Sequence, residues 1–399
     1  MITNKGKNLI AKYLIGQTPA YASYIALGCG ANPQKETHTF TTNEVGTTGS
    51  AGFINQSALE FEMFRVPIIS KGYIYENGIS KIVFTAEMPT AERYGITEIG
   101  VYPALTNPSA LRDSFEIFSF TSDEGWGIHS NSTNITSTAP TITDTIDLLV
   151  PSGFTKYFQT NVSNAGLTGD QRVSRQEQLR SSSNAIFLRG DFSSPFTYDG
   201  VSKPTVSTTA NNYLTISNPN IDLSQNNPLD EIRLALSVIS TDVTNGSLPV
   251  SINIAIELVD GSQKSAIVVN QITPANSNLT AGDYSSSTQG NRYVVSKIAL
   301  GSSNFYKDTG FDTANIVEAR IHANITDSAG QSSTNYWIGL DGLRLENLSD
   351  VNPLFALSAY TVLKNSLYAN AGTIEYAAPA IKALNTSGLV EFKFSMDVI

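Results

Sequence analysis

Charged residues are scarce in this chain of 399 residues, of which 15% are Asp, Glu, Lys or Arg, whereas soluble proteins average roughly 25%. Serine, threonine and asparagine fill the gap. Their side chains compete with the backbone hydrogen bonds of helices and suit strands and turns. The composition therefore predicts a mainly β protein, and the length is sufficient for more than one domain.

Positive charge, cysteine and long apolar runs are also in short supply. The net charge is −10 and Lys and Arg do not cluster, which excludes nucleic acid as a partner because phosphate binding depends on basic side chains. Cys29 is the single cysteine, so an internal disulfide and a thiolate metal site are excluded. Since no apolar run reaches the roughly 18 residues of a membrane span, we expect no membrane insertion and no signal peptide.

The N-terminal segment ITNKGKNLIAKYLIG predicts a short amphipathic helix. Thr3 or Asn4 is a suitable cap at its start, and Gly16 is suitably placed to end it. We expect its apolar face to cover a sheet of its own domain rather than to contact a membrane. The four apolar residues at helical spacing are Leu9, Ile10, Tyr13 and Leu14.

The stretch YIALGCGANP, residues 24 to 33, looks like the start of a nucleotide-binding motif. Such a motif needs a helix directly after its glycines, because the free amides of the helix start hold the phosphate. Pro33 and a run of Thr, Asn and Gly follow instead, with no helical periodicity. We therefore predict no cofactor site and no set of aligned amides for an anion, and we interpret Gly28 and Gly30 as the turn from a strand into a surface loop.

Extended segments follow this loop. Two strands flank Glu76-Asn77-Gly78, where Asn-Gly favours a tight hairpin turn. The segment YGITEIGVYPA predicts another strand, because its apolar residues alternate. We interpret Glu98 in this segment as a charge on the solvent side of the strand, without a catalytic role.

The helix, the Gly-x-Gly strand end and this late strand together resemble the N-terminal domain of bacteriophage tail-collar fibre and baseplate-attached fibre proteins. The resemblance implies a part of the virion tail, assembled in the host cytoplasm, whose small α+β first domain docks on other tail or baseplate proteins. Since tail parts occur as symmetric copies, a homo-oligomer, either a trimer or a ring, is expected. The residues that carry the resemblance are Thr3, Gly6, Ala26, Gly28, Gly30, Glu98, Ile99, Gly100, Val101 and Tyr102.

The composition changes along the rest of the chain. We predict an attachment domain over residues 1–160 and a charged linker, which could contain a short helix, over residues 161–183. Eight alternating segments without intervening helices predict an antiparallel, jelly-roll-like β-sandwich over residues 184–347. Residues 348–399 are too few for a domain of their own, so we expect them to pack back on the N-terminal domain, with the sandwich as an insertion.

The first and last strands of the predicted sandwich, AIFLRGDF and YWIGLDGLRLEN, resemble those of carbohydrate-binding jelly rolls. In that family an Asp of the final strand helps to hold a structural calcium. The matching residue is Asp341, with Asp191 as its partner. Ser193 or Ser194 stands near the place of the family's early Glu, so a hydrogen-bonded Asp that caps a turn is favoured over calcium. No other cofactor is expected.

An enzyme is not expected. The three histidines, His38, His129 and His322, are isolated in the sequence, and nothing marks a nucleophile elbow. We therefore predict no catalytic residue.

Two other functions are considered. A structural component of a phage tail is favoured, as an adaptor or short fibre, because the chain lacks the heptads or β-helix period of a long fibre. The alternative is a receptor-binding protein whose sandwich binds a glycan on the host surface. Sugar rings stack on exposed aromatic side chains, and the candidates for that contact are Tyr284, Tyr336 and Trp337.

Overall fold

The computed structural model describes residues 3–17, 22–30, 57–76, 78–90, 94–96, 98–103, 115–118, 126–129, 134–135, 186–189, 196–197, 199, 201–206, 213–240, 251–272, 291–303, 305–326, 336–348, 356–359, 380–382 and 388–395. Within these ranges the regular structure is one helix and twenty-three strands. The protein is therefore mainly β, as its composition predicts. No helix in these ranges is long and apolar enough to cross a membrane.

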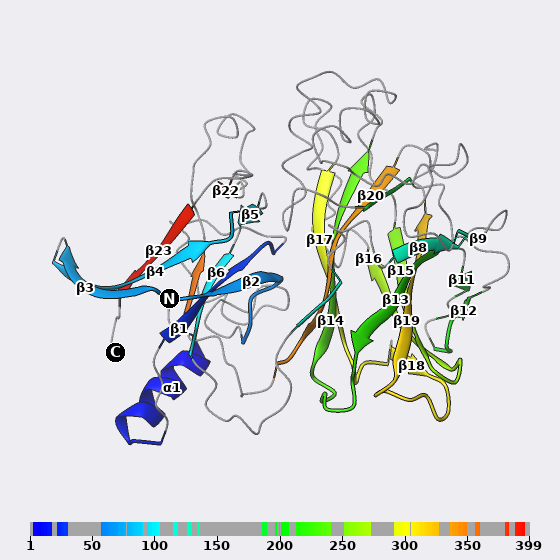
Figure 1. Ribbon diagram of the computed structural model, residues 1–399, viewed down its shortest axis with the longest axis horizontal. Coiled ribbons are helices and arrows are strands. Elements are labelled where there is room, and N and C mark those ends of the chain that lie inside the picture. The colour runs from blue at the N-terminus through cyan, green and yellow to red at the C-terminus, as the bar shows by residue number, and fades with distance from the viewer. Residues whose placement is uncertain are drawn as a thin grey trace. The chain divides into compact units, whose positions relative to one another are not determined.

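Two compact units make up the fold (Figure 1). The first consists of residues 1–113 and 348–399, and the second of residues 114–347. We expected the first boundary at residue 160, but strands β7 (Phe115–Phe118) and β8 (Trp126–His129) pair with strands of the second unit. Both are short strands with aromatic residues, and each gains backbone hydrogen bonds by adding to a larger sheet.

Helix α1 (Asn4–Leu14) opens the first unit. The Oγ1 of Thr3 accepts a hydrogen bond from the Gly6 amide at 2.9 Å, which satisfies a donor that the first helical turn leaves open. Gly6 and Leu9 are buried, but Tyr13 and Leu14 are 56% and 76% exposed. The helix and its Thr3 cap agree with prediction, whereas the buried face does not extend to the last turn.

One sheet of the first unit has four antiparallel strands in the order β2-β1-β6-β21. They are β1 (Ala22–Gly28), β2 (Glu62–Pro67), β6 (Glu98–Pro103) and β21 (Ala356–Ala359). A second sheet has the order β23-β4-β3, and a third pairs β22 with β5. These strands are β3 (Ser70–Glu76), β4 (Ile79–Met88), β5 (Tyr94–Ile96), β22 (Ala380–Lys382) and β23 (Gly388–Ser395).

The last three strands of the chain each pair with a strand from its first 103 residues. Strand β21 pairs with β6, β22 with β5 and β23 with β4, and Figure 1 shows β23, in red, beside β4. Their apolar residues share one core, in which Val390 packs with Ile25, Phe84 and Val101. The chain thus leaves the first unit after β6 and returns to it at β21.

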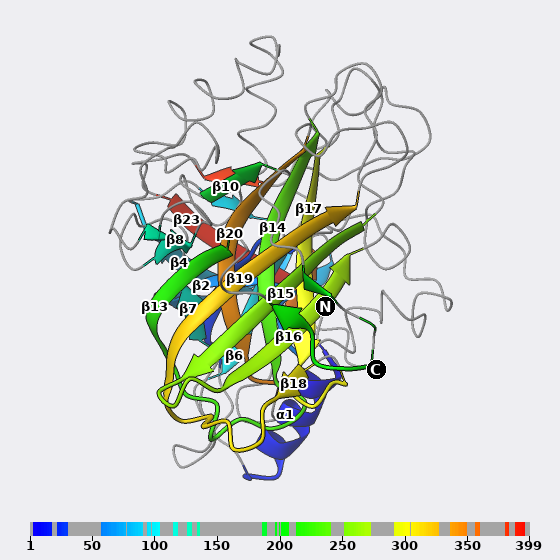
Figure 2. The ribbon, with the colours of Figure 1, turned by 90° about the vertical axis from the view of Figure 1, so that its right-hand side faces the viewer.

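The second unit is an antiparallel β-sandwich, which confirms the predicted fold class. One sheet has the order β18-β16-β15-β19-β13-β8-β9, and the other has the order β10-β20-β14-β17 with β7 also paired to β20. Figure 2 looks onto the first of these sheets, with β14, β17 and β20 behind it.

The strands of the seven-stranded sheet, besides β8, are β9 (Asn134–Ile135), β13 (Tyr213–Ile221), β15 (Ser251–Asp260), β16 (Ser265–Ile272), β18 (Phe305–Lys307) and β19 (Ile316–Thr326). Those of the other sheet, besides β7, are β10 (Ile186–Arg189), β14 (Glu231–Ser240), β17 (Asn291–Ala299) and β20 (Tyr336–Glu346). A separate hairpin pairs β11 (Phe196–Thr197) with β12 (Thr205–Val206).

Strand β15 shows how the sequence builds this core. Ile254, Ile256 and Leu258 alternate along it and are buried among apolar residues of both sheets. Each such side chain contributes about 1.5 to 3 kcal/mol when it is fully removed from water. Because side chains alternate between the two faces of a strand, Glu257 lies on the opposite, outer face of the sheet.

Candidate functional site

Three backbone amides converge on the carboxylate of Glu98 beside the end of β1. Gly30 and Phe61 donate to Oε1 at 3.1 and 2.9 Å, and Glu60 donates to Oε2 at 2.8 Å. Glu98 is only 9% exposed, so its interpretation as a solvent-side charge is wrong. The strand register places Glu98 opposite Gly28, where the missing side chain leaves room for the carboxylate.

The two glycines therefore accommodate an anion that belongs to the chain itself. A Cβ at Gly28 would lie 2.5 Å from Oε1 of Glu98, and one at Gly30 would lie 2.6 Å from Oε2 of Glu60. The expectation that no amides converge here is thus wrong, although the group they bind is an internal carboxylate. The segment that would carry the helix of a nucleotide site, from residue 31 onward, lies outside the described residues.

Tyr102 and Arg65 close the same corner of the first unit. Tyr102 as a whole residue is 1% exposed. Its hydroxyl accepts a hydrogen bond from the amide of Leu59 at 3.2 Å. The guanidinium of Arg65 lies 3.9 Å above the Tyr102 ring and donates two hydrogen bonds to Glu62, at 2.9 and 2.8 Å. Glu98 and Tyr102, from one strand, thus hold the segment of residues 59–61 in place, which is an architectural role.

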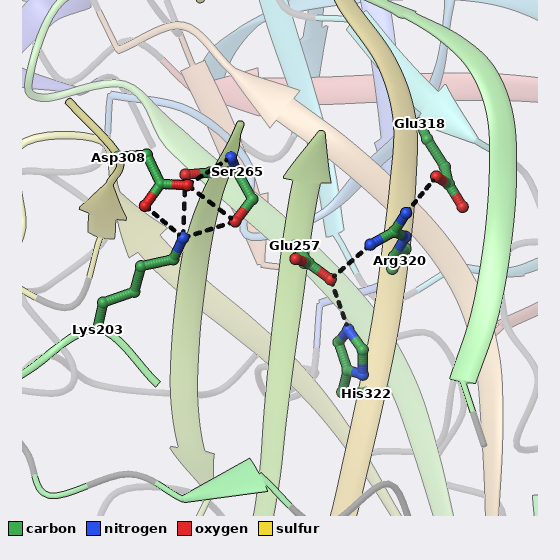
Figure 3. A network of polar contacts seen from close by, with 7 residues as sticks. All are labelled: Lys203, Glu257, Ser265, Asp308, Glu318, Arg320 and His322. Atoms are coloured by element: carbon green, nitrogen blue, oxygen red, sulfur yellow. Dashed lines mark hydrogen bonds and ion pairs between the residues drawn. The ribbon is translucent and has the colours of Figure 1, made fainter. Parts of the chain in front are cut away.

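A second polar cluster lies on the outer face of the seven-stranded sheet (Figure 3). On β15, Oε2 of Glu257 lies 3.1 Å from Nε2 of His322 and 3.4 Å from Nη1 of Arg320, both on β19. Arg320 also donates to Glu318 at 2.7 Å. Tyr213 of β13 packs beside them, with its ring centroid 5.1 Å from that of His322 and 5.5 Å from Cζ of Arg320.

Burial and charge pairing compete at this cluster. Burial acts to raise the pKa of Glu257, but the hydrogen bond and attraction of His322, together with Arg320, outweigh it and lower this pKa. Burial acts to lower the pKa of Arg320, and its contacts with Glu318 and Glu257 raise this pKa instead. Burial raises the pKa of Tyr213. Glu257 and Arg320 therefore stay charged near neutral pH, and neither is poised to exchange a proton.

Lys203, Ser265 and Asp308 form a third polar group, also drawn in Figure 3. The ammonium of Lys203 donates to Oγ of Ser265 at 2.6 Å and to Oδ1 of Asp308 at 2.7 Å. A serine beside a lysine is one arrangement for nucleophilic catalysis, which requires a neutral lysine as base. Here the hydrogen bond from Lys203 lowers the pKa of Asp308, so a charged carboxylate lies beside the lysine. The group ties the segment before β12 to the start of β16 and to Asp308, which directly follows the edge strand β18.

Sequence reasoning missed Glu257 and Arg320, and it treated His322 as isolated. A signal was present, because Glu257 and Arg320 are charged residues at outer-face positions of two alternating strands, β15 and β19. The sequence did not reveal that these strands are neighbours, with Glu257 directly opposite Arg320 in the register.

Of the predicted calcium ligands, the structure describes Asp341. It is fully buried in β20, at a register shift where Leu340 pairs with Leu236 and Gly342 pairs with Ala235. Asp191 lies outside the described residues. No group of three or more His, Cys, Asp or Glu residues that could hold a metal occurs in the described ranges. Calcium binding and the turn-capping alternative both stay predictions.

Of the predicted glycan contacts, Tyr336 and Trp337 are the first two residues of β20. Trp337 pairs with Ile239 of β14 and Arg189 of β10, and Tyr336 pairs with Ser240. Tyr284 lies outside the described residues. Sugar binding by these aromatic residues stays a prediction.

No protein-family model and no curated protein matches this chain. Among solved structures, the CBM22-1 xylan-binding domain from Paenibacillus barcinonensis Xyn10C is 11% identical, over 62% of this chain and 99% of that one, with a TM-score of 0.25. The CBM22-1-CBM22-2 tandem domain of Xyn10C has the same identity and TM-score, over 63% and 48%. The infectious bursal disease virus Gx strain structure is 10% identical, over 95% and 61%, with a TM-score of 0.19. Likenesses this low support no conclusion about function.

Proposed function

We propose that this protein is a non-enzymatic structural component of a phage virion, which attaches to the tail or baseplate through its first unit and presents the β-sandwich as an adaptor or short fibre. The proposal rests on the distribution of large exposed apolar side chains between the two units. Among the described residues, those in the first unit are Tyr13, Leu14, Ile15, Tyr24, Ile69, Tyr73, Tyr75 and Leu389, and those in the second are Val201 and Leu229.

A contiguous group of large exposed apolar side chains marks a surface that another molecule covers. Tyr13, Leu14 and Ile15 are consecutive at the end of α1, and Leu14 and Ile15 are 76% and 69% exposed. This helix end offers a compact apolar projection to a neighbouring protein. It supports attachment through the first unit rather than through the sandwich.

The corner around Glu98 is consistent with a structural role. Glu98 and Tyr102, which carry part of the resemblance to tail fibre proteins, both bind the backbone of residues 59–61. Because these residues stabilise the backbone of the first unit, the resemblance concerns its fold rather than a reactive site. Such hydrogen bonds help to make an attachment domain rigid.

The polar clusters also favour a structural role over catalysis. Glu257 is paired with Arg320 and His322, and Asp308 is paired with Lys203. A general acid or base needs a pKa near the working pH, whereas these carboxylates have lowered pKa values.

Cross-linking of purified virions tests the proposal. An amine-reactive cross-linker, followed by mass spectrometry, should join lysines of the first unit, such as Lys5, Lys7, Lys12, Lys71 and Lys81, to other tail proteins. The lysines of the sandwich serve as the internal control, namely Lys203, Lys264, Lys297 and Lys307. Tail cross-links confined to the sandwich, or absence of the chain from virions, would overturn the proposal.

A further inference from the structure

Strand β3 carries two of the most exposed aromatic side chains of the described structure. Tyr73 and Tyr75 are 69% and 71% exposed, and their spacing of two puts them on the same face of the strand. Tyr73 pairs with Ile82 of β4, and the hydroxyl of Tyr73 lies 2.5 Å from Oγ of Ser80. This hydrogen bond helps to hold the Tyr73 ring in one position.

The same face is buried where β4 meets the core of the first unit. Phe84 and Ala86 are 5% and 0% exposed, and Ile82 packs against the core beside them. Tyr73 and Tyr75 therefore continue this apolar face of the sheet from its buried part into an exposed part. Their aromatic area is available to a partner at little entropic cost, because a tyrosine side chain has few rotatable bonds.

The backbone of β3 is also open to a partner. In the described part of the chain, β3 is the edge strand of the sheet β23-β4-β3 and pairs on one side with β4. Its seven residues, SKGYIYE, contain no proline, which would block pairing at an edge. A further strand can thus add to β3 by backbone hydrogen bonds.

The charge of β3 permits a second copy of this chain as the partner. Two copies, each with a net charge of −10, repel one another unless they meet at a neutral surface. Strand β3 provides one along its edge, since its sequence contains one lysine, Lys71, and one glutamate, Glu76.

We propose that β3 pairs antiparallel with β3 of a second copy, centred on Tyr73, so that the two sheets join into one of six strands. In this register Tyr73 faces its own counterpart and Lys71 faces Tyr75 of the second copy, which allows a cation–π contact. Such a contact is isologous, because each copy contributes the same strand. A contact of this kind joins the copies in pairs, whereas the resemblance to tail fibre proteins implies a trimer or a ring. It rests on the tail function proposed above only for its biological setting.

Sedimentation velocity of the purified full-length chain tests this pairing. The wild type should dimerise at micromolar concentration, and the double variant Tyr73→Thr/Tyr75→Thr should dimerise at least tenfold more weakly. Threonine keeps the β propensity of the strand, and circular dichroism checks that the variant is folded. Leu389→Thr is the matched control, since Leu389 is 66% exposed on β23 but adjoins the buried Val390 and so lies on the opposite face. Its dimerisation should equal that of the wild type.

A disulfide trap at position 73 tests the register while Tyr75 and the backbone pairing of β3 stay in place. Opposite residues of an antiparallel pair have Cβ atoms about 4.5 to 5.5 Å apart, close to disulfide geometry. Tyr73→Cys should give a covalent dimer under mild oxidation, whereas Leu389→Cys should not; the native Cys29 is buried. A monomeric wild type, or equal cross-linking of both variants, would overturn the proposal. A dimer that forms in solution while the chain is absent from virions would contradict the tail function and leave this interface intact.

Discussion

Among single residues, Glu98 gives the most direct test of what stabilises the first unit. Glu98→Gln keeps the size of the side chain but replaces one acceptor oxygen with a donor that faces backbone amides. We expect a loss of about 2 to 3 kcal/mol in the free energy of unfolding, because hydrogen bonds to a charged group are lost and buried donors are left open. Urea denaturation of the full-length chain measures it.

The control for this prediction is Glu87→Gln, at an exposed position of β4 in the same unit. It should change the unfolding free energy by less than about 0.5 kcal/mol. Gly28→Ala provides a second probe of the same corner and should cost about 1 to 3 kcal/mol through overpacking, whereas Gly72→Ala has nothing within 4 Å of the added Cβ. Equal stability of the two alanine variants would refute the close approach of Glu98 to Gly28.

The stability of the sandwich should depend on pH through Asp260. Its carboxylate accepts hydrogen bonds from the amides of Ser262, Lys264 and Asp312 at 2.8, 2.9 and 2.8 Å, and the bond from Asp312 leads the causes that lower its pKa. A lowered pKa means that the unfolded chain binds the proton more tightly. The stabilisation is therefore complete above the unfolded pKa of about 3.9 and is lost as the pH falls through the lower folded pKa.

Asp260→Asn isolates this contribution. The variant should be less stable than the wild type at pH 7, and the difference should shrink once the pH drops below about 4. Guanidinium denaturation midpoints of both proteins, measured from pH 7 to pH 2.5, provide the comparison. A difference that stays constant over this range would show that the charge of Asp260 does not stabilise the fold.

At the scale of elements, alternation in the sequence predicted the strands well. All eight alternating segments after residue 184 contain a strand of the sandwich, from β10 to β20. The alternation of apolar and polar residues indicates which face of a strand is buried, but it does not identify the neighbouring strand. The position of Glu98 was missed for this reason, because its burial depends on Gly28, which is a neighbour in space and distant in sequence.

Helix α1 shows the same limit. Its apolar spacing and Thr3 cap are local features, and both were predictable from the sequence. How much of the apolar face is covered depends on the elements packed against it, and only Gly6 and Leu9 are buried. Exposed residues at its end, such as Leu14, therefore could not be distinguished from core residues by their pattern.

At the scale of the whole molecule, the first unit needs both ends of the chain. Removal of residues 348–399 takes away the partners of β4, β5 and β6 and exposes core residues that pack on Val390. We expect strands β1 to β6 of the truncated chain to lose their protease resistance, while the strands of the sandwich keep theirs. Limited proteolysis with mass spectrometry measures both regions in one sample.

The matched control for this truncation removes only residues 396–399, which follow β23. It should leave the proteolytic pattern of the wild type unchanged. Continued resistance of strands β1 to β6 after loss of 348–399 would show that the first unit does not require its C-terminal strands.

Attachment through the first unit is the central claim about function, and a cryo-EM map of the assembled virion tests it most directly. The map should place residues 1–113 and 348–399 against neighbouring tail or baseplate proteins, with the apolar end of α1 covered. The β-sandwich should face away from that contact. A map in which the sandwich is embedded in the tail and the first unit lies free would contradict the claim.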